Sequence, residues 1–280
     1  LDRGIVRISN PQRLTISLNT IGTGPVGIAI NPAGTRLYVA TSGTADSKIT
    51  GFPIDPNTGA LGSYTQYTVG TGLKLWDIAI NPVSTNVFVT DQTNNRVYKG
   101  TVDAAGPLSF SASDYLATGT MPYCVTVEPA GTYAYVANQT EGSIFAYTIS
   151  SGFSSLDTHI VATGANPEKI VISPSGKFAY VPSPANNGIY AYIINMVGKL
   201  EAISSSFIST GTSTNPREGV VDPTGQYLYV SLNTNNSIAG FKIGSGGGLT
   251  SLSPATVSTK TGSTGINPLG MAIATVKGSP

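Results

Sequence analysis

The chain repeats one short pattern five times. A stretch typified by "NPAGTRLYVAT" (31–41) recurs with its turn proline 45 to 50 residues further on, and an aromatic residue follows each proline by six positions. The prolines are Pro32, Pro82, Pro129, Pro174 and Pro223, and the aromatic residues are Tyr38, Phe88, Tyr135, Tyr180 and Tyr229. A period of this length indicates stacked supersecondary units, none of which can bury its apolar face alone.

Each unit contains the pattern of four short strands. A short apolar strand precedes the proline turn, and a second strand carries the Tyr-Val core. An Asn-rich hairpin leads to a third strand that alternates with period two, as in "SIFAYTI" (143–149), and a fourth ends in a sequence such as "VATG" (161–164). Four antiparallel strands in about 45 residues are typical of a β-propeller blade. A helical solenoid would instead require apolar faces with a period of 3.6 residues.

The repeats therefore predict one all-β domain over residues 1–280, a β-propeller with six blades of about four antiparallel strands. The expected blades are 24–72, 73–120, 121–165, 166–214, 215–266, and a closing blade shared between the two ends of the chain, 267–280 with 1–23. No copy of the Tyr-Val strand remains for the closing blade. This blade is either irregular, or completed by chain beyond Pro280, or completed by a strand from another molecule, which would allow self-association by strand addition.

The composition excludes several functions. Charged residues make up 10% of the chain and the net charge is +1, whereas nucleic-acid binding needs a clustered cationic surface. No apolar run approaches the roughly 20 residues of a transmembrane helix. The single cysteine, Cys124, and the single histidine, His159, exclude metal motifs that need several of either, so we expect no metal and no cofactor. A hydroxyl-rich surface with few charges favours an extracellular, cell-surface or periplasmic location.

The pattern "NPxGxxLYVA" with its Asn-rich hairpin resembles YVTN-type β-propeller repeats and the wider superfamily of six-phosphogluconolactonase-like lactonases. The resemblance covers nearly the whole chain and implies a propeller fold. It is less specific for function, because such propellers serve as lactonases, surface antigens, adhesins and scaffolds. The lactonase relatives usually have seven blades and tend to carry Pro-Arg-His where this chain has Pro216, Arg217 and Glu218. The histidine that acts on the lactone is therefore absent at that position.

The residues around the start of each first strand vary from copy to copy while the framework repeats. In a propeller these positions surround the central opening, so we expect a protein or carbohydrate ligand there. The candidate ligand-binding residues are Trp76, Asp77, Tyr123, Glu168, Lys169, Arg217 and Glu218. Trp76 and Tyr123 would either stack on the ligand or plug the opening.

Two interpretations of the charged candidates remain. Glu168 or Glu218 would act as a general base, and Arg217 or Lys169 would hold an anionic substrate. In this interpretation Glu168, Arg217 and Glu218 are the candidate catalytic residues of a lactone hydrolase. Alternatively, Lys169 and Arg217 neutralise the two glutamates across adjacent blades. The sequence favours the second interpretation, and with it a binding or structural module, over an enzyme.

Overall fold

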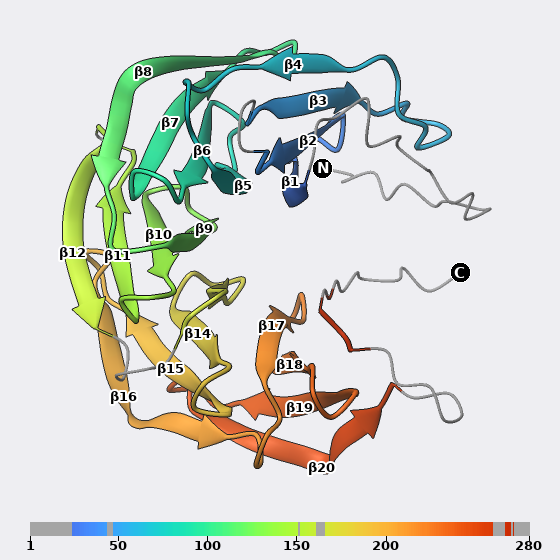
Figure 1. Cartoon of the computed structure of the whole chain (residues 1–280). Helices are drawn as coiled ribbons and strands as arrows, with labels where there is room; N and C mark the ends of the chain where they lie inside the picture. Colours follow the sequence, from blue (N-terminus) through green and yellow to red (C-terminus); the bar gives the residue numbers. More distant parts are fainter. Residues whose placement is uncertain are drawn as a thin grey trace. The chain divides into compact units, whose positions relative to one another are not determined.

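The computed structural model describes residues 24–43, 47–150, 152–160, 166–259, 267–269 and 271. These residues form five four-stranded antiparallel sheets, and in each sheet every strand pairs with the next one along the sequence (Figure 1). The prediction of an all-β chain built from repeated four-stranded units is therefore confirmed. The expected closing blade lies outside the described residues, apart from residues 267–269 and 271. No helix long and apolar enough to cross a membrane occurs in the described part.

The chain divides into two compact units, Leu1–Ala117 and Thr118–Pro280. The first unit contains the first sheet, β1 (Pro25–Ile30), β2 (Arg36–Thr41), β3 (Ile49–Pro53) and β4 (Thr65–Tyr67). It also contains the second sheet, β5 (Leu75–Ile80), β6 (Asn86–Asp91), β7 (Arg96–Val102) and β8 (Leu108–Ala117).

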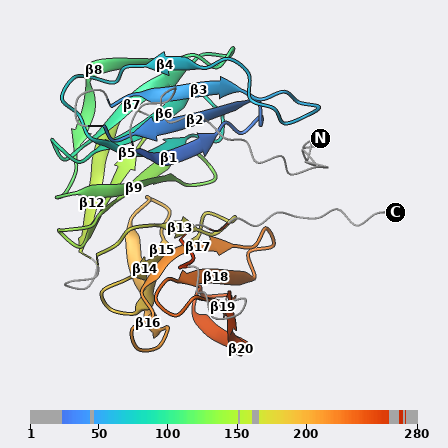
Figure 2. The same ribbon diagram turned by 45° about the vertical axis from the view of Figure 1, so that its right-hand side comes forward.

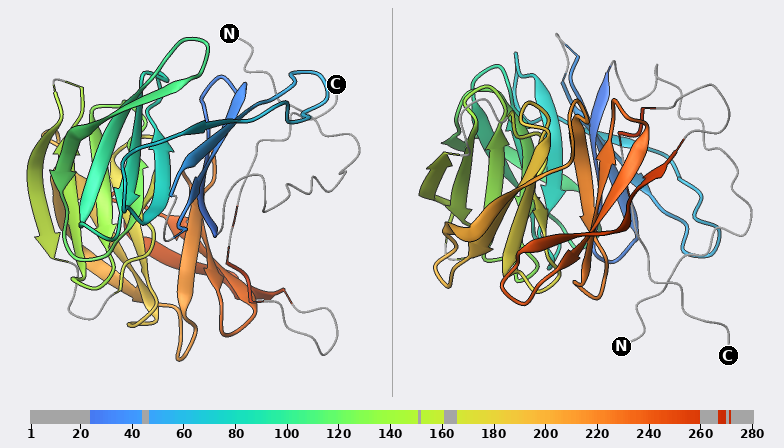
Figure 3. Two further views of the ribbon diagram at one scale, coloured as in Figure 1. Left: turned by 45° about the horizontal axis from the view of Figure 1, so that its top comes forward. Right: turned by 90° about the horizontal axis from the view of Figure 1, so that it is seen from below.

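The second unit contains the other three sheets. The third sheet consists of β9 (Pro122–Val127), β10 (Tyr133–Asn138), β11 (Ser143–Thr148) and β12 (Ser154–Ile160). The fourth consists of β13 (Val171–Ile172), β14 (Phe178–Ser183), β15 (Gly188–Ile194) and β16 (Leu200–Ser209). The fifth consists of β17 (Pro216–Val221), β18 (Tyr227–Leu232), β19 (Ser237–Ile243) and β20 (Leu249–Ser258), drawn from orange to red in Figure 3.

The turn between the first two strands of each sheet is fixed by the polar residue before the proline. In the first sheet, Asn31 Oδ1 accepts hydrogen bonds from the backbone N–H groups of Thr35 and Arg36, both at 2.9 Å. The glycine of the turn, Gly34, has a φ of +69°, a conformation that a residue with a side chain adopts only at a cost. The equivalent polar residues Asn81, Glu128, Ser173 and Asp222 accept from the backbone in the same way.

The second-strand aromatic residues bind neighbouring sheets together within each unit. Tyr38 and Tyr135 are fully buried, and their hydroxyl groups donate to backbone carbonyls in the third-to-fourth-strand hairpin of the next sheet. Tyr180 makes the same contact with Gly247 O at 3.0 Å. Tyr229 differs, because it is only half-buried. The cause is its place in the fifth sheet, which no further described sheet follows.

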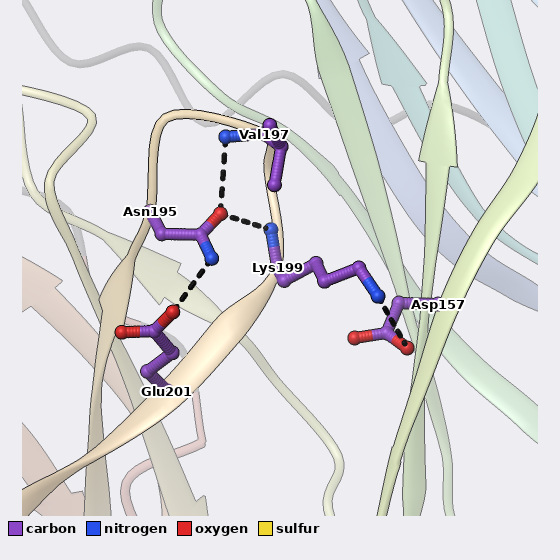
Figure 4. Close-up of polar contacts among 5 residues, drawn as sticks. All are labelled: Asp157, Asn195, Val197, Lys199 and Glu201. Carbon is purple, nitrogen blue, oxygen red and sulfur yellow. Dashed lines mark hydrogen bonds and ion pairs between the residues drawn. The ribbon is translucent and has the colours of Figure 1, made fainter.

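A polar cluster fixes one of these hairpins (Figure 4). Asn195 Oδ1 accepts from the backbone N–H groups of Val197 and Lys199, at 3.0 and 2.9 Å, and Asn195 Nδ2 donates to Glu201 Oε1 at 2.7 Å. Lys199 Nζ lies 3.7 Å from Asp157 Oδ1 on β12, so the hairpin of the fourth sheet is also tied to the third sheet.

Candidate functional site

The first strands of the second unit bring five of the candidate residues into one region. Thr126 Oγ1 on β9 donates to the Ile170 carbonyl at 3.1 Å, and β13 lies beside β17 (Figure 2). Tyr123 lies on β9, Glu168 and Lys169 precede β13, and Arg217 and Glu218 lie on β17. The candidates were expected around the start of each first strand. In the third and fifth sheets they are strand residues, whereas in the fourth sheet they lie in the loop before β13, which has only two residues.

Most of the candidates lie at irregularities in strand pairing. On β17 the register with β18 shifts between Pro216 and Gly219, which encloses Arg217 and Glu218. On β5 the shift falls between Leu75 and Ile78, which encloses Trp76 and Asp77. Extra residues of this kind leave the ladder and re-aim side chains, which is why bulges often occur beside functional sites. The sequence variation from copy to copy thus coincides with positions at which the backbone departs from regular pairing.

Glu168 is the centre of a buried polar contact between sheets. Its side chain is 9% exposed, and Glu168 Oε1 accepts from Arg217 Nη1 and, at 2.8 Å, from Gln139 Nε2. The carboxylate is satisfied by a cation from the fifth sheet and an amide from the third. The charge neutralisation that the sequence suggested is therefore present for this pair of residues.

Gln139 was not among the sequence-based candidates. It follows β10 directly, in the hairpin before β11, and Gln92 occupies the equivalent place after β6. The repeated Gln after the second strand was the available signal. Its significance depended on knowing that this hairpin reaches the first strand of the next sheet.

Beside this contact, a groove of about 300 Å³ runs between β13 and β17. Lys169 and Glu218 line it from the two sides, with Thr126 and the aliphatic residues of both strands completing its walls. The Glu218 backbone is held in place because its N–H donates to Ser231 Oγ at 3.2 Å. The groove is therefore lined by one acidic side chain, one basic side chain and one hydroxyl group.

Trp76 and Asp77 belong to the first unit and do not line this groove. The Lys74 ammonium lies 5.2 Å from the centre of the Trp76 ring, a cation–π contact. Asp77 is 7% exposed, and its N–H donates to Thr90 Oγ1 at 3.0 Å. Because Gly27 has no Cβ atom, β1 can pack closely against β5. A Cβ atom at this position would lie 2.8 Å from Trp76 O on β5.

The remaining candidates contribute little to the groove. Tyr123 is half-buried on β9 and is not part of the groove lining. Cys124, the single cysteine, is 1% exposed and belongs to the apolar cluster between the third and fourth sheets. In the described ranges, no three His, Cys, Asp or Glu residues are grouped so that they could hold a metal ion.

Comparison with known proteins identifies relatives of this chain. The model of the family described as "Lactonase, 7-bladed beta-propeller" matches residues 74–264, more than half of the chain. No curated protein sequence matches. Whereas the repeat predicts six blades, the family description gives seven.

Solved structures share the fold at low sequence identity. The periplasmic gluconolactonase of Pseudomonas aeruginosa is 18% identical with a TM-score of 0.69, over 84% of this chain and 70% of its own. A protein from Lactobacillus plantarum is 17% identical with a TM-score of 0.70, over 84% of this chain and 71% of its own. A catalytically inactive virginiamycin B lyase from Staphylococcus aureus, solved with quinupristin, is 18% identical with a TM-score of 0.64, over 92% and 76%.

Proposed function

This chain belongs to the lactonase family of seven-bladed β-propellers, and from that premise we propose that it is a binding module whose ligand occupies the groove between β13 and β17. The ligand is a carbohydrate or a protein segment. A groove of about 300 Å³ with an acidic and a basic side chain on opposite walls suits a hydroxylated or zwitterionic group that both donates and accepts hydrogen bonds.

The observation that carries this proposal is the contact of Glu168 with Arg217 and Gln139. A carboxylate that accepts hydrogen bonds from a guanidinium and an amide is held in one position. Glu168 and Arg217 therefore act as a fixed rim beside the groove, and Lys169 and Glu218 are the side chains that meet the ligand.

The second candidate function is lactone hydrolysis, which the family match and the place of Glu218 in the groove favour. In this reaction Glu218 would accept a proton from water as the water oxygen attacks the lactone carbonyl carbon. The proton would then pass to the ring oxygen as the carbon–oxygen bond of the ring breaks. Lys169 would hold an anionic group of the substrate.

Two measurements on the same variants separate the candidates. We expect titration calorimetry with oligosaccharides and peptides to detect a ligand whose binding Lys169→Ala and Glu218→Gln weaken, while no lactone is hydrolysed above the uncatalysed rate. Lactone turnover that Glu218→Gln removes would instead establish the hydrolase. If Glu168→Gln abolished lactone turnover and Glu218→Gln did not, Glu168 would be more than a fixed rim and Glu218 would not be the general base. That result would contradict both proposed functions of the groove.

We further propose the six-blade ring over residues 1–280 as a single domain, closed by 267–280 with 1–23, and an exported location. The regular spacing of the repeats, 45 to 50 residues, and the low charge support these proposals. Electron microscopy of the purified chain would test the blade number, and seven blades or an open arc in the class averages would contradict it. Fractionation of the native host, with the chain detected in the cytosol alone, would contradict export.

A further inference from the structure

Gly219 interrupts a column of aliphatic residues in the first strands of the sheets. The equivalent residues in the first to fourth sheets are Ile28, Ile78, Val125 and Ile170. Ile78 and Ile170 are each 4% exposed, and each belongs to the apolar cluster that joins its sheet to the preceding one. The fifth sheet therefore has no side chain at a position that the other repeats fill with an aliphatic one.

The residue that faces this column comes from the preceding sheet. Thr126 of the third sheet meets Ile170, because its Oγ1 donates to the Ile170 carbonyl. Val171 is the equivalent of Thr126 in the fourth sheet, and a Cβ atom added at Gly219 would lie 3.2 Å from Val171 Cγ2. At this junction one valine side chain faces a residue that has none. The groove between β13 and β17 thus lies where the least side-chain volume fills the space between two sheets.

The lining of the groove favours a ligand with an aliphatic group. Besides Thr126, Lys169, Glu218 and Gly219, the residues that line it are Ile170, Val171, Ile172, Val220 and Val221. None of the described residues in this lining is aromatic, whereas proteins commonly hold a sugar ring by stacking it on an aromatic side chain. An aliphatic group placed against these walls would be removed from water at no cost in unpaired polar atoms. The lining therefore favours a peptide over a carbohydrate.

The backbone of β17 also suits a peptide. This strand is the edge strand of the fifth sheet, with β18 as its one neighbour in that sheet. The Asp222 N–H, just after β17, is directed toward β18 and donates to Tyr227 O at 2.9 Å. Because backbone groups alternate in direction along a strand, those of Gly219 and Val221 point away from β18. Groups at the edge of a sheet pair with extended peptide chains.

We propose that the groove between β13 and β17 binds a short peptide with an aliphatic side chain, an inference that rests on the proposed function and narrows its ligand. The aliphatic side chain lies over Gly219 and against Val171, and the peptide backbone pairs with the edge of β17. The amino and carboxylate ends of the peptide lie toward Glu218 and Lys169, whose charges are opposite to theirs. Gly219 and Val171 are thus the residues that determine specificity.

The probe is the unmodified tripeptide Ala-Ile-Ala, and the measurement is titration calorimetry with the full chain. We expect saturable binding that weakens at least about ten-fold for Ala-Gly-Ala, because the aliphatic contact is lost. Acetylation of the amino end together with amidation of the carboxylate end removes both charges, and should weaken binding by at least about five-fold.

Two variants test the residues that determine specificity. Gly219→Val puts a side chain of the protein where that of the ligand would lie, and should weaken binding of Ala-Ile-Ala at least about ten-fold. Gly246→Val is the matched control, because nothing lies within 4 Å of an added Cβ atom there, and should leave binding unchanged. Val171→Ala widens the groove, and should shift the preference from Ala-Ile-Ala toward Ala-Phe-Ala by at least about five-fold.

Thermal unfolding checks that each variant is folded, and Val171→Ala tests the proposal even if Gly219→Val does not fold. Equal affinity for Ala-Ile-Ala and Ala-Gly-Ala would overturn the inference, and so would an unchanged preference in Val171→Ala. Suppose instead that an oligosaccharide binds, that Lys169→Ala and Glu218→Gln weaken it, and that no tripeptide binds. The inference would then be overturned while the binding module stands. Lactone turnover that Glu218→Gln removes, without tripeptide binding, would overturn both.

Discussion

Arg217 Nη1 donates directly to Glu168 Oε1, although the two residues lie 49 positions apart in the sequence. The side chain of Glu168 is 9% exposed and that of Arg217 is 32% exposed, so the contact is formed at the edge of the interior. A charge pair in this position is screened less by solvent than a surface pair, and each partner would be left poorly solvated without the other.

This contact predicts a measurable coupling energy. In a double-mutant cycle of Glu168→Gln and Arg217→Met, measured by urea unfolding, we expect about 1–2 kcal/mol of coupling. The control is the pair Lys199 and Asp157, whose side chains are 46% and 31% exposed and whose charged atoms are 3.7 Å apart. That cycle should give less than about 0.5 kcal/mol. Equal coupling in the two cycles would contradict the special role of Glu168.

Tyr135 should contribute in two separable ways. Tyr135→Ala removes a fully buried ring and should lower the free energy of unfolding by roughly 3–5 kcal/mol. Tyr135→Phe removes only the hydroxyl that donates to Gly198 O, and should cost about 0.5–1.5 kcal/mol. Tyr133→Phe is the control, because its hydroxyl contact with Met196 O is exposed and 3.3 Å long, and should cost less than Tyr135→Phe. If Tyr135→Ala lowered the free energy of unfolding by less than about 1 kcal/mol, the buried position of Tyr135 on β10 would be contradicted.

Gly198 should not tolerate a side chain. Its φ is +80°, and an added Cβ atom would lie 2.5 Å from the Tyr133 ring, so Gly198→Ala combines backbone strain with a clash. We expect a loss of at least roughly 1–3 kcal/mol in thermal or urea unfolding. Gly246→Ala is the matched control, since nothing lies within 4 Å of the added atom there. Similar losses for the two variants would show that the hairpin adapts to the extra atom.

Asp222 should make stability depend on pH under acidic conditions. Burial alone would raise the pKa of Asp222, but hydrogen bonds from Thr224 and from the backbone N–H groups of Tyr227, Thr224 and Gln226 outweigh burial and lower it. Because the pKa in the folded chain lies below that in the unfolded chain, this stabilisation is fully present above about pH 4. It is lost as the pH falls through the folded-state value.

The substitution Asp222→Asn provides the test, because Asn already occupies this position in the first two repeats as Asn31 and Asn81. We expect the variant to be close to the parent in stability at pH 7 and to lose less stability between pH 5 and pH 2, both followed by urea unfolding. Parallel pH profiles for parent and variant would contradict the assignment.

Much of each sheet could be predicted from the sequence, because its determinants are local. The polar residue before each proline fixes a tight turn together with a left-handed residue two positions after the proline, which is Ser84 in the second repeat and Gly in the other four. Likewise Asn95 and Asn187, with φ values of +52° and +51°, adopt the left-handed conformation expected of hairpin asparagines. The candidate residues were found by a different local signal, their variation against a constant framework.

The partners of those residues could not be predicted in the same way. Glu168 contacts Arg217 and Gln139, but nothing in the sequence pattern distinguished this contact from other pairings of the same charged residues. Which side chains meet depends on which of them the bulges and hairpins bring within reach of one another.

The sequence by itself determined the period, the turns and the alternation that make each group of about 45 residues a four-stranded sheet, since these depend on interactions between residues close together in the chain. The tertiary structure decided which faces are covered. Ile28 and Ile78 occupy the same place in their repeats, yet one is 66% and the other 4% exposed. Burial depends on the parts of the fold that pack against a strand, and these are not specified by the strand's own residues.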